Sequence, residues 1–134
     1  MNAATNEGLG TAVRCPIKQG QLDYVLGPRE PLDDAQLWEK CFRGRGVALD
    51  TVVRIRRILS DILEVDVVRI RPRDDFSKDL SFFLDLDSLA DLKIVHALEE
   101  DFKITISDAE AEGMKTFRDI VLGVHAKIIS RRTA

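Results

Sequence analysis

The sequence predicts an all-α protein, and three observations carry that prediction. Apolar residues recur at three- and four-residue spacing in long segments, most clearly at residues 50–64, 88–103 and 117–128. No segment shows a convincing alternation of apolar and polar residues, the pattern of a half-buried strand. The 134-residue chain is 45% hydrophobic and 32% charged, which suits one packed domain with a modest extension.

Residues 1–46 are predicted to form an N-terminal extension with one extra helix, ahead of a bundle domain over residues 47–134. Glycine and proline are frequent in the first thirty residues, which favours a flexible arm. Its only candidate for regular structure is a short extended stretch at Leu22–Leu26. A proline followed by acidic residues predicts a helix over residues 31–42. The Arg-Gly-Arg-Gly sequence at 43–46 then ends this helix as a hinge.

The next helix is predicted over residues 50–64 and has a wide apolar stripe. Its other side carries three arginines that are expected to be solvated, Arg54, Arg56 and Arg57. Residues 65–86 form a connection that is long for a compact domain, and such connections are often functional. Apolar side chains within this connection are expected to hold it against the core.

A third helix is predicted to begin at Ser88 with Asp87 as its N-cap, because an Asp side chain can accept a hydrogen bond from an exposed N–H of the first turn. It is expected to end near Lys103. Its inward face is expected to comprise Leu89, Leu92, Val95, Leu98 and Phe102.

Two capping signals predict the last helices. Ser107 and Glu110 have the spacing of a capping box, which opens a short helix that closes near Gly113. Thr116 and Asp119 give a looser signal for the final helix. The core face of that helix is expected to comprise Phe117, Ile120, Val121, Val124 and Ile128.

Composition and charge exclude several classes of function. A net charge of −3 without a block of Lys and Arg argues against nucleic-acid binding. No run approaches the roughly 20 apolar residues of a membrane span, and the N-terminus lacks the pattern of a signal peptide. Cys15 and Cys41 have no metal-ligand spacing, so both are expected to be reduced thiols in a cytoplasmic protein, which we expect to be a monomer.

The residues from 85 to 112 form an acidic segment in an otherwise nearly neutral chain. They include nine acidic and two basic residues, a net charge of −7. A solvated helix face would explain this pattern. A surface that attracts basic protein partners would explain it as well, and we favour that interpretation.

Ser88 is the candidate functional residue, because it stands at a helix start where free N–H groups and the helix dipole favour a phosphate. A catalytic nucleophile would need a base within hydrogen-bond reach, and His96 lies about 12 Å further along the same helix. The consecutive acids Glu99, Glu100 and Asp101 point in different directions and cannot converge on one metal ion. The residues therefore disfavour an enzyme or a metal centre, and they leave a modification site or a plain helix-start residue as the interpretations of Ser88.

Short motifs follow Ser88 in a fixed order. Asp-Ser-Leu at 87–89 leads to Ala-Leu-Glu-Glu-Asp-Phe at 97–102 and Ile-Thr-Ile-Ser-Asp at 104–108, and Phe-Ser-Lys-Asp-Leu precedes the serine at 76–80. Each motif is weak alone. The ordered set resembles the acyl carrier protein family over roughly residues 50–130.

The resemblance implies an acyl-carrier-like four-helix bundle with a covalent 4′-phosphopantetheine arm on Ser88, within the motif that Asp87 and Leu89 complete. The arm would come from coenzyme A by the action of a separate phosphopantetheinyl transferase. Its thiol would hold an acyl group as a thioester, so the protein would carry intermediates and catalyse nothing. The implied partners are that transferase and acyl-transferring or acyl-activating enzymes that dock on the acidic 85–112 surface.

The chain departs from the family pattern beside the serine. Four extra residues stand between Asp79-Leu80 and Asp87, and they bring in Phe82-Phe83-Leu84, which would either shape a slot for the acyl chain or add core packing. Lys93 and His96 replace the Glu and Met that are common in fatty-acid carriers. These changes favour a specialised lipid or secondary-metabolite pathway. A peptidyl or aminoacyl carrier and an unmodified helical adaptor remain as alternatives.

Overall fold

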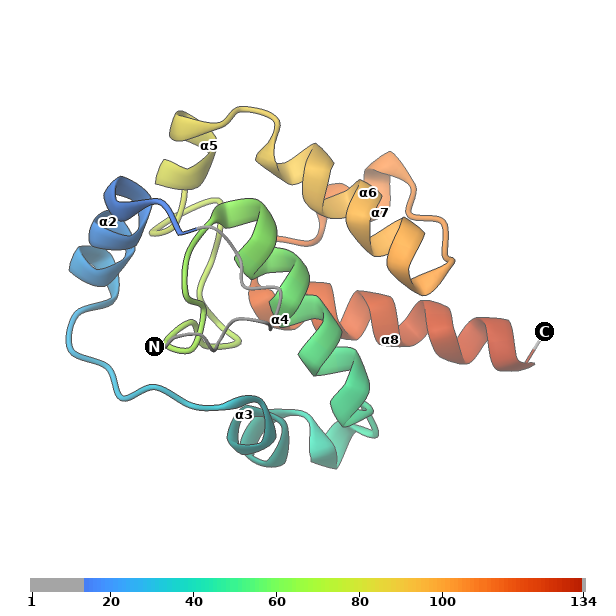
Figure 1. Cartoon of the computed structure of the whole chain (residues 1–134). Coiled ribbons are helices and arrows are strands. Elements are labelled where there is room, and N and C mark those ends of the chain that lie inside the picture. Colours follow the sequence, from blue (N-terminus) through green and yellow to red (C-terminus); the bar gives the residue numbers. More distant parts are fainter. Residues whose placement is uncertain (1–13, 134) are drawn as a thin grey trace, which may run out of the picture.

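The computed structural model describes residues 14–133, and within them the protein is all-α, as predicted (Figure 1). Its elements in chain order are α2 (Pro16–Leu26), α3 (Asp34–Cys41), a 3₁₀ turn (Arg43–Arg45), α4 (Leu49–Leu63), α5 (Phe82–Leu86), α6 (Ala90–Phe102), α7 (Asp108–Glu112) and α8 (Phe117–Thr133). Extended pairing in this part of the chain is limited to one isolated bridge, between Asp75 and Thr116. No helix there is long and apolar enough to cross a membrane.

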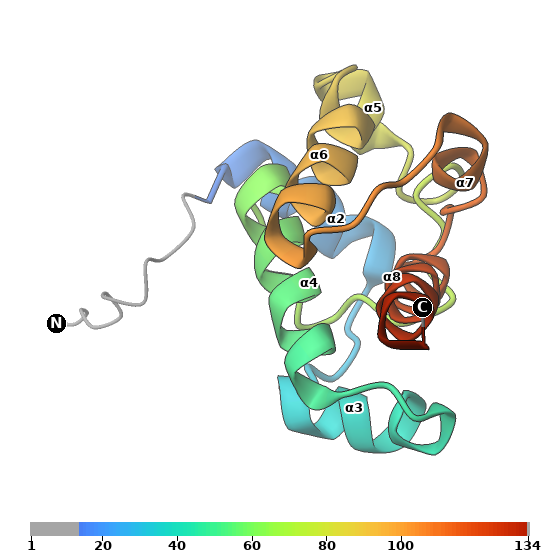
Figure 2. The ribbon, with the colours of Figure 1, turned by 90° about the vertical axis from the view of Figure 1, so that its right-hand side faces the viewer.

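Helix α4 is the centre of the fold and packs against α3, α6 and α8. The predicted apolar stripe is confirmed, since Val52, Ile55 and Leu59 are completely buried. Helices α3 and α5 lie at opposite ends of the molecule in both views, and α6 and α7 stand to either side above α8 in Figure 2. The core therefore runs along α4 from the extension to the segment around Ser88.

Helix α6 buries a different face from the one predicted. Ala90, Ile94, Leu98 and Phe102 are buried at steps of four, whereas Leu89 is 55% and Leu92 51% exposed. Leu89 precedes Leu98 by nine residues, which is two and a half turns at 3.6 residues per turn. Leu89 therefore projects from the side of the helix axis opposite to the buried Leu98. The prediction was therefore correct for Leu98 and Phe102 and wrong for the two leucines nearest Ser88.

The prediction of a flexible arm is wrong for residues 14–30, and residues 1–13 lie outside the described part. Residues Pro16–Leu26 form α2 instead of an arm with an extended stretch, with Pro16 in the first turn, where its missing N–H costs nothing. Leu22 and Leu26, one turn apart, enter the same core as α4. Burial of this pair stabilises α2, and it offsets the low helix propensity of Gly20 in the middle of the helix.

Polar contacts across nearly fifty residues hold α2 to the end of α4. The Cys15 amide donates to the Glu64 carbonyl at 2.8 Å, and Lys18 Nζ pairs with Glu64 Oε1 at 2.8 Å. The Asp66 amide donates to Gln19 Oε1 at 2.7 Å. The division at residue 46 stays a prediction, but side chains of α2 and α3 share one core with the bundle.

Helix α3 begins three residues later than predicted. Asp33 and Gln36 form a capping box, in which each side chain accepts a hydrogen bond from the other residue's amide, and this places the start at Asp34. Leu37 and Phe42 are fully buried. At the predicted hinge the chain makes a 3₁₀ turn and leaves it through Gly46, whose φ of 78° favours glycine.

Arg56 is buried, which contradicts the prediction of a solvated arginine. It is 4% exposed, and its Nη1 donates to the Leu32 carbonyl at 2.9 Å and to Asp34 Oδ1 at 3.0 Å. Its Nη2 reaches the Val68 carbonyl at 3.4 Å. One guanidinium thus joins α4 to the segment before α3 and to the long connection.

Apolar side chains hold the long connection against the core, as predicted, since Leu80 and Phe83 are buried, and the connection contains an unpredicted helix. Its amide at Phe76 donates to the Lys115 carbonyl at 2.7 Å, and the Arg118 amide donates to the Pro72 carbonyl at 2.8 Å. Arg29 holds Asp74 through two hydrogen bonds, at 2.6 and 3.1 Å. The connection ends in α5, which delivers the chain to Ser88.

The last two helices follow their capping signals. Ser107 and Glu110 form the predicted capping box, and α7 closes at Gly113. At α8 the Asp119 amide donates to Thr116 Oγ1 at 3.0 Å, and the Thr116 amide donates to Asp119 Oδ2 at 3.1 Å. Both helix starts could be predicted from the sequence, because each cap is formed by two residues only three positions apart.

Candidate functional site

Ser88 lies in the turn between α5 and α6. These two helices stand at the upper edge of the molecule in Figure 1. Ser88 is exposed, and its hydroxyl makes no hydrogen bond with any residue from 14 to 133. Helix α6 begins at Ala90 with Leu89 as its N-cap, so the prediction that Ser88 starts the helix with Asp87 as cap is wrong by two residues. The serine precedes the free N–H groups of α6 and presents an unengaged oxygen to solvent.

Asp87 closes the turn around the serine. Its Oδ1 accepts a hydrogen bond from the Leu89 amide at 3.0 Å, and its Oδ2 pairs with Lys93 Nζ at 2.7 Å. The hydrogen bond from Lys93, and after it the one from the Leu89 amide, lowers the pKa of the Asp87 carboxyl. Lys18 on α2 adds a weaker attraction. The carboxylate therefore stays ionised and fixes the backbone on both sides of Ser88.

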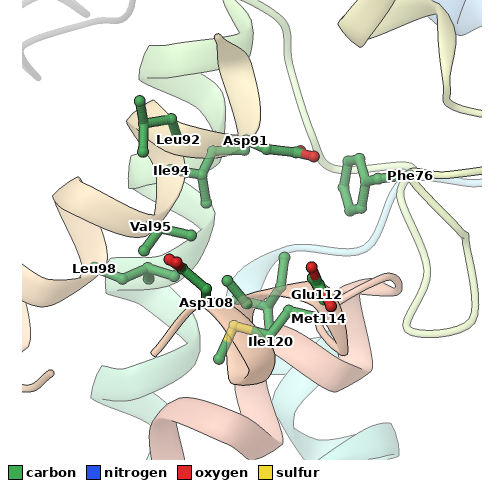
Figure 3. Close-up of a pocket in the computed structure, with 11 residues that line it drawn as sticks. Phe76, Asp91, Leu92, Ile94, Val95, Leu98, Asp108, Glu112, Met114 and Ile120 are labelled. Carbon is green, nitrogen blue, oxygen red and sulfur yellow. The ribbon is translucent and has the colours of Figure 1, made fainter. Parts of the chain in front are cut away.

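An apolar cavity of about 390 Å³ lies between α6, α7, α8 and the long connection (Figure 3). Its apolar lining comprises Phe76, Leu92, Ile94, Val95, Leu98, Ala111, Met114 and Ile120. Leu92 belongs both to this lining and to the exposed first turn of α6, next to Ser88 in the chain. A group tethered at Ser88 can therefore reach an apolar space along one helix.

Three carboxylates border the same cavity, on Asp91, Asp108 and Glu112 (Figure 3). Asp91 lies largely at the surface, yet partial desolvation against the cavity raises the pKa of its carboxyl. The sequence contained a signal for Asp91, because it stands three, four and seven residues before Ile94, Val95 and Leu98. No sequence signal brings Phe76 and Met114 to the same space, since nearly forty residues separate them.

The extra residues before Ser88 form α5 and pack mainly on the core. Phe83 is 3% exposed, and its ring centroid lies 4.2 Å from that of Phe82 and 6.5 Å from that of Phe76. None of the residues Phe82, Phe83 and Leu84 lines the cavity, which they reach only through Phe76. This arrangement favours the packing alternative over direct shaping of an acyl slot.

Phe82→Ala is therefore expected to lower the free energy of unfolding by about 1–2 kcal/mol, because it removes a half-buried ring and its contact with Phe83. The preference for acyl chain length is expected to stay unchanged. Urea denaturation measures the first quantity, and thermal shifts on loading with short and long acyl chains measure the second. Phe76→Leu, which alters the cavity wall itself, is the control that should change the preference. A changed preference in Phe82→Ala with unchanged stability would contradict the packing interpretation.

An ion pair fixes α7, one wall of the cavity, to α8. Lys127 Nζ lies 2.8 Å from Glu110 Oε2, and this hydrogen bond, followed by that of the Ser107 amide, lowers the pKa of Glu110 from 4.5 to about 2. A depressed pKa in the folded protein gives stability that is present above pH 4.5 and is lost as the pH falls toward 2. In Lys127→Met, Glu110 is expected to titrate nearer its ordinary pKa and this acid-dependent loss to shrink. Carbon NMR of the Glu110 carboxyl measures the shift, and a midpoint near 4.5 in the unaltered protein would contradict the pair.

The other candidate residues do not converge on a catalytic or metal centre. His96 is exposed on α6, and His125 borders a second cavity of about 420 Å³ between α4, α6 and α8, formed by a different set of residues. Within residues 14–133, no group of three His, Cys, Asp or Glu side chains could hold a metal ion. Three of the nine acids in the 85–112 segment form ion pairs, namely Asp87, Asp101 and Glu110.

A small helical domain with an exposed serine before a helix and an apolar cavity beside it is the architecture of a protein that carries a tethered group. The phosphopantetheine attachment site family matches residues 53–122, a segment that includes Ser88. The chain is 37% identical over 78 residues to an acyl carrier protein of Helicobacter hepaticus, covering 58% of this chain and 97% of that protein. It is 35% identical over 75 residues to an acyl carrier protein of Thermosynechococcus vestitus, covering 56% and 88%.

The chain belongs to the acyl carrier protein family. It is accordingly a carrier that bears 4′-phosphopantetheine covalently, and it is not an enzyme. The helices before residue 50 stand outside the matched segment.

Proposed function

We propose that Ser88 carries the phosphopantetheine arm and that the arm presents acyl intermediates to enzymes of a specialised lipid or secondary-metabolite pathway. The observation that supports this most directly is the Ser88 hydroxyl, exposed and without a hydrogen-bond partner among residues 14–133. A phosphopantetheinyl transferase would join this oxygen to the phosphate that leaves coenzyme A. Asp87 and Leu89 flank the proposed attachment site, and the hydrogen bond from the Leu89 amide to the Asp87 carboxylate fixes the turn that presents Ser88 to the transferase.

The cavity supports a second part of the proposal, in which the acyl chain is buried between α6 and α7, away from solvent. Burial of an apolar chain gains about 0.8 kcal/mol per CH₂ group. A buried chain would keep the thioester away from water until a partner enzyme binds. Leu92 gives the chain a continuous apolar path from the first turn of α6 into the cavity. The arm would therefore alternate between this cavity and the active site of a partner.

Partner enzymes are proposed to dock on the acidic 85–112 surface around α6. Lys93 and His96 stand exposed on this helix among acids such as Glu100, so a partner must match a mixed pattern of charge. Contacts of this kind give fast association that weakens as salt is added. This mixed pattern is what supports a specialised pathway, and the cytoplasmic location and the monomeric state remain predictions from the sequence.

The test is incubation of the full chain with coenzyme A and a transferase of broad specificity, followed by intact-mass measurement. The expected result is the gain of one phosphopantetheinyl group, which peptide fragmentation assigns to Ser88. No gain under conditions that fully modify a known carrier would contradict the proposal and favour an unmodified adaptor.

A further inference from the structure

We infer that the cavity beside α6 selects acyl groups that carry a protonated amine at the far end of the chain and disfavours acyl groups that carry a carboxylate there. This inference rests on the proposed function and names the class of cargo within it. It follows from the shape of the cavity and from the charges at its border.

The cavity is large enough and apolar enough to hold an acyl chain. Its volume of about 390 Å³ lies within the range of small-ligand sites, and eight of its eleven lining residues are apolar. Met114 gives the wall an adaptable element, because its unbranched side chain can move to fit different occupants. The cavity floor by itself therefore accepts any short apolar chain and does not discriminate between cargoes.

The charges at the border supply the discrimination. Figure 3 shows the Asp91 side chain extending toward Phe76, while Asp108 and Glu112 come from other sides of the cavity. Among the described residues that line it, none is basic, and none of the three carboxylates pairs with a cation elsewhere in residues 14–133. The other lone acids of the segment, such as Glu100, stand outside the lining.

Three unpaired carboxylates around an apolar space favour one kind of occupant. An ammonium group would pair with unpaired carboxylates at the edge of an apolar space, and partial desolvation raises the pKa of one of them, Asp91. A carboxylate on the cargo would add a fourth negative charge at the same place. Since the three acids remain accessible to water, each attraction is modest, and the expected preference for an amine over a neutral group is about fivefold.

The unmodified full-length protein provides a test that does not depend on the arm. Hexylammonium, hexanol and hexanoate have the same six-carbon chain and differ only in the end group. Their dissociation constants are measured from the NMR shifts of the Ile94 and Ile120 methyl groups, both of which line the cavity. Hexylammonium is expected to bind about fivefold more tightly than hexanol, with hexanoate weakest.

A matched pair of variants separates the cavity acids from general negative charge. Asp91→Asn is expected to reduce the ratio between hexylammonium and hexanoate affinities by about threefold, whereas Glu100→Gln removes one negative charge from the same helix outside the cavity and is expected to leave the ratio unchanged. Equal effects of the two variants would overturn the inference. So would tighter binding of hexanoate, or the absence of any shift with all three probes.

The tethered form gives the second measurement. Protein loaded through its arm with 6-aminohexanoyl, hexanoyl or 5-carboxypentanoyl thioesters is compared by thermal unfolding, and the midpoint is expected to rise most for 6-aminohexanoyl. If the protein accepts no arm, the proposed function fails while the free probes still decide the selectivity. If the arm attaches and the amine has no advantage in either measurement, only the selectivity is overturned.

Discussion

Ser88→Ala is expected to abolish attachment of the phosphopantetheine arm, with no gain of mass after incubation with coenzyme A and the transferase. The arm is joined through a hydroxyl oxygen, and alanine has none. The substitution should leave the fold intact, because the residue is exposed and its hydroxyl bonds to nothing in residues 14–133. The free energy of unfolding should therefore change by less than about 0.5 kcal/mol.

Ser77→Ala is the matched control for this prediction. Ser77 is also an exposed serine close in the chain, and its hydroxyl already donates to Asp75 at 2.5 Å. This variant should accept one arm just as the unaltered protein does. Arm addition to Ser88→Ala, or loss of addition in Ser77→Ala with the fold intact, would move the attachment site away from Ser88.

Arg56→Ala is expected to lower the free energy of unfolding by about 3 kcal/mol, the largest effect on stability that we predict for one polar residue. The substitution removes a buried guanidinium that donates to the carbonyls of Leu32 and Val68 and to Asp34. The Leu32 carbonyl would then lose its charged donor inside the core, whereas the Val68 carbonyl would keep the Leu32 amide and Arg71 as donors. Urea denaturation of the full chain measures the change. The stability of Arg56→Lys is expected to lie between those of the unaltered protein and Arg56→Ala, because a lysine keeps the charge and loses the planar guanidinium.

Arg57 provides the internal control, because it follows Arg56 directly on α4 and its side chain is exposed. Arg57→Ala should change the free energy of unfolding by no more than about 0.5 kcal/mol. If the two alanine variants were equally stable, the contacts of Arg56 would have no net value. The interpretation that this residue joins α4 to the extension would then be wrong.

The comparison of these two arginines shows where inference from the sequence ends. Arg56 stands four residues after Val52 and three before Leu59, at the edge of the buried stripe, whereas Arg57 faces away from that stripe. The spacing of the apolar residues does not show whether a residue at the edge of the stripe is covered. Arg56 is buried only because residues 32–34 and Val68 come to cover it, from positions 12 to 24 residues away in the chain. Such coverage depends on tertiary packing, which a periodic pattern along one helix does not encode.

The sequence by itself determined the all-α class, the stripe of α4, the capped starts of α7 and α8, and the ordered motifs that lead to Ser88. Each of these depends on residues within one or two helical turns, or on the order of motifs along the chain. Only the tertiary structure decided that residues 16–26 form a helix, that Arg56 is buried and that Asp91, Asp108 and Glu112 border one cavity. These features need contacts between distant segments, and the free energy of those contacts overrides local preference.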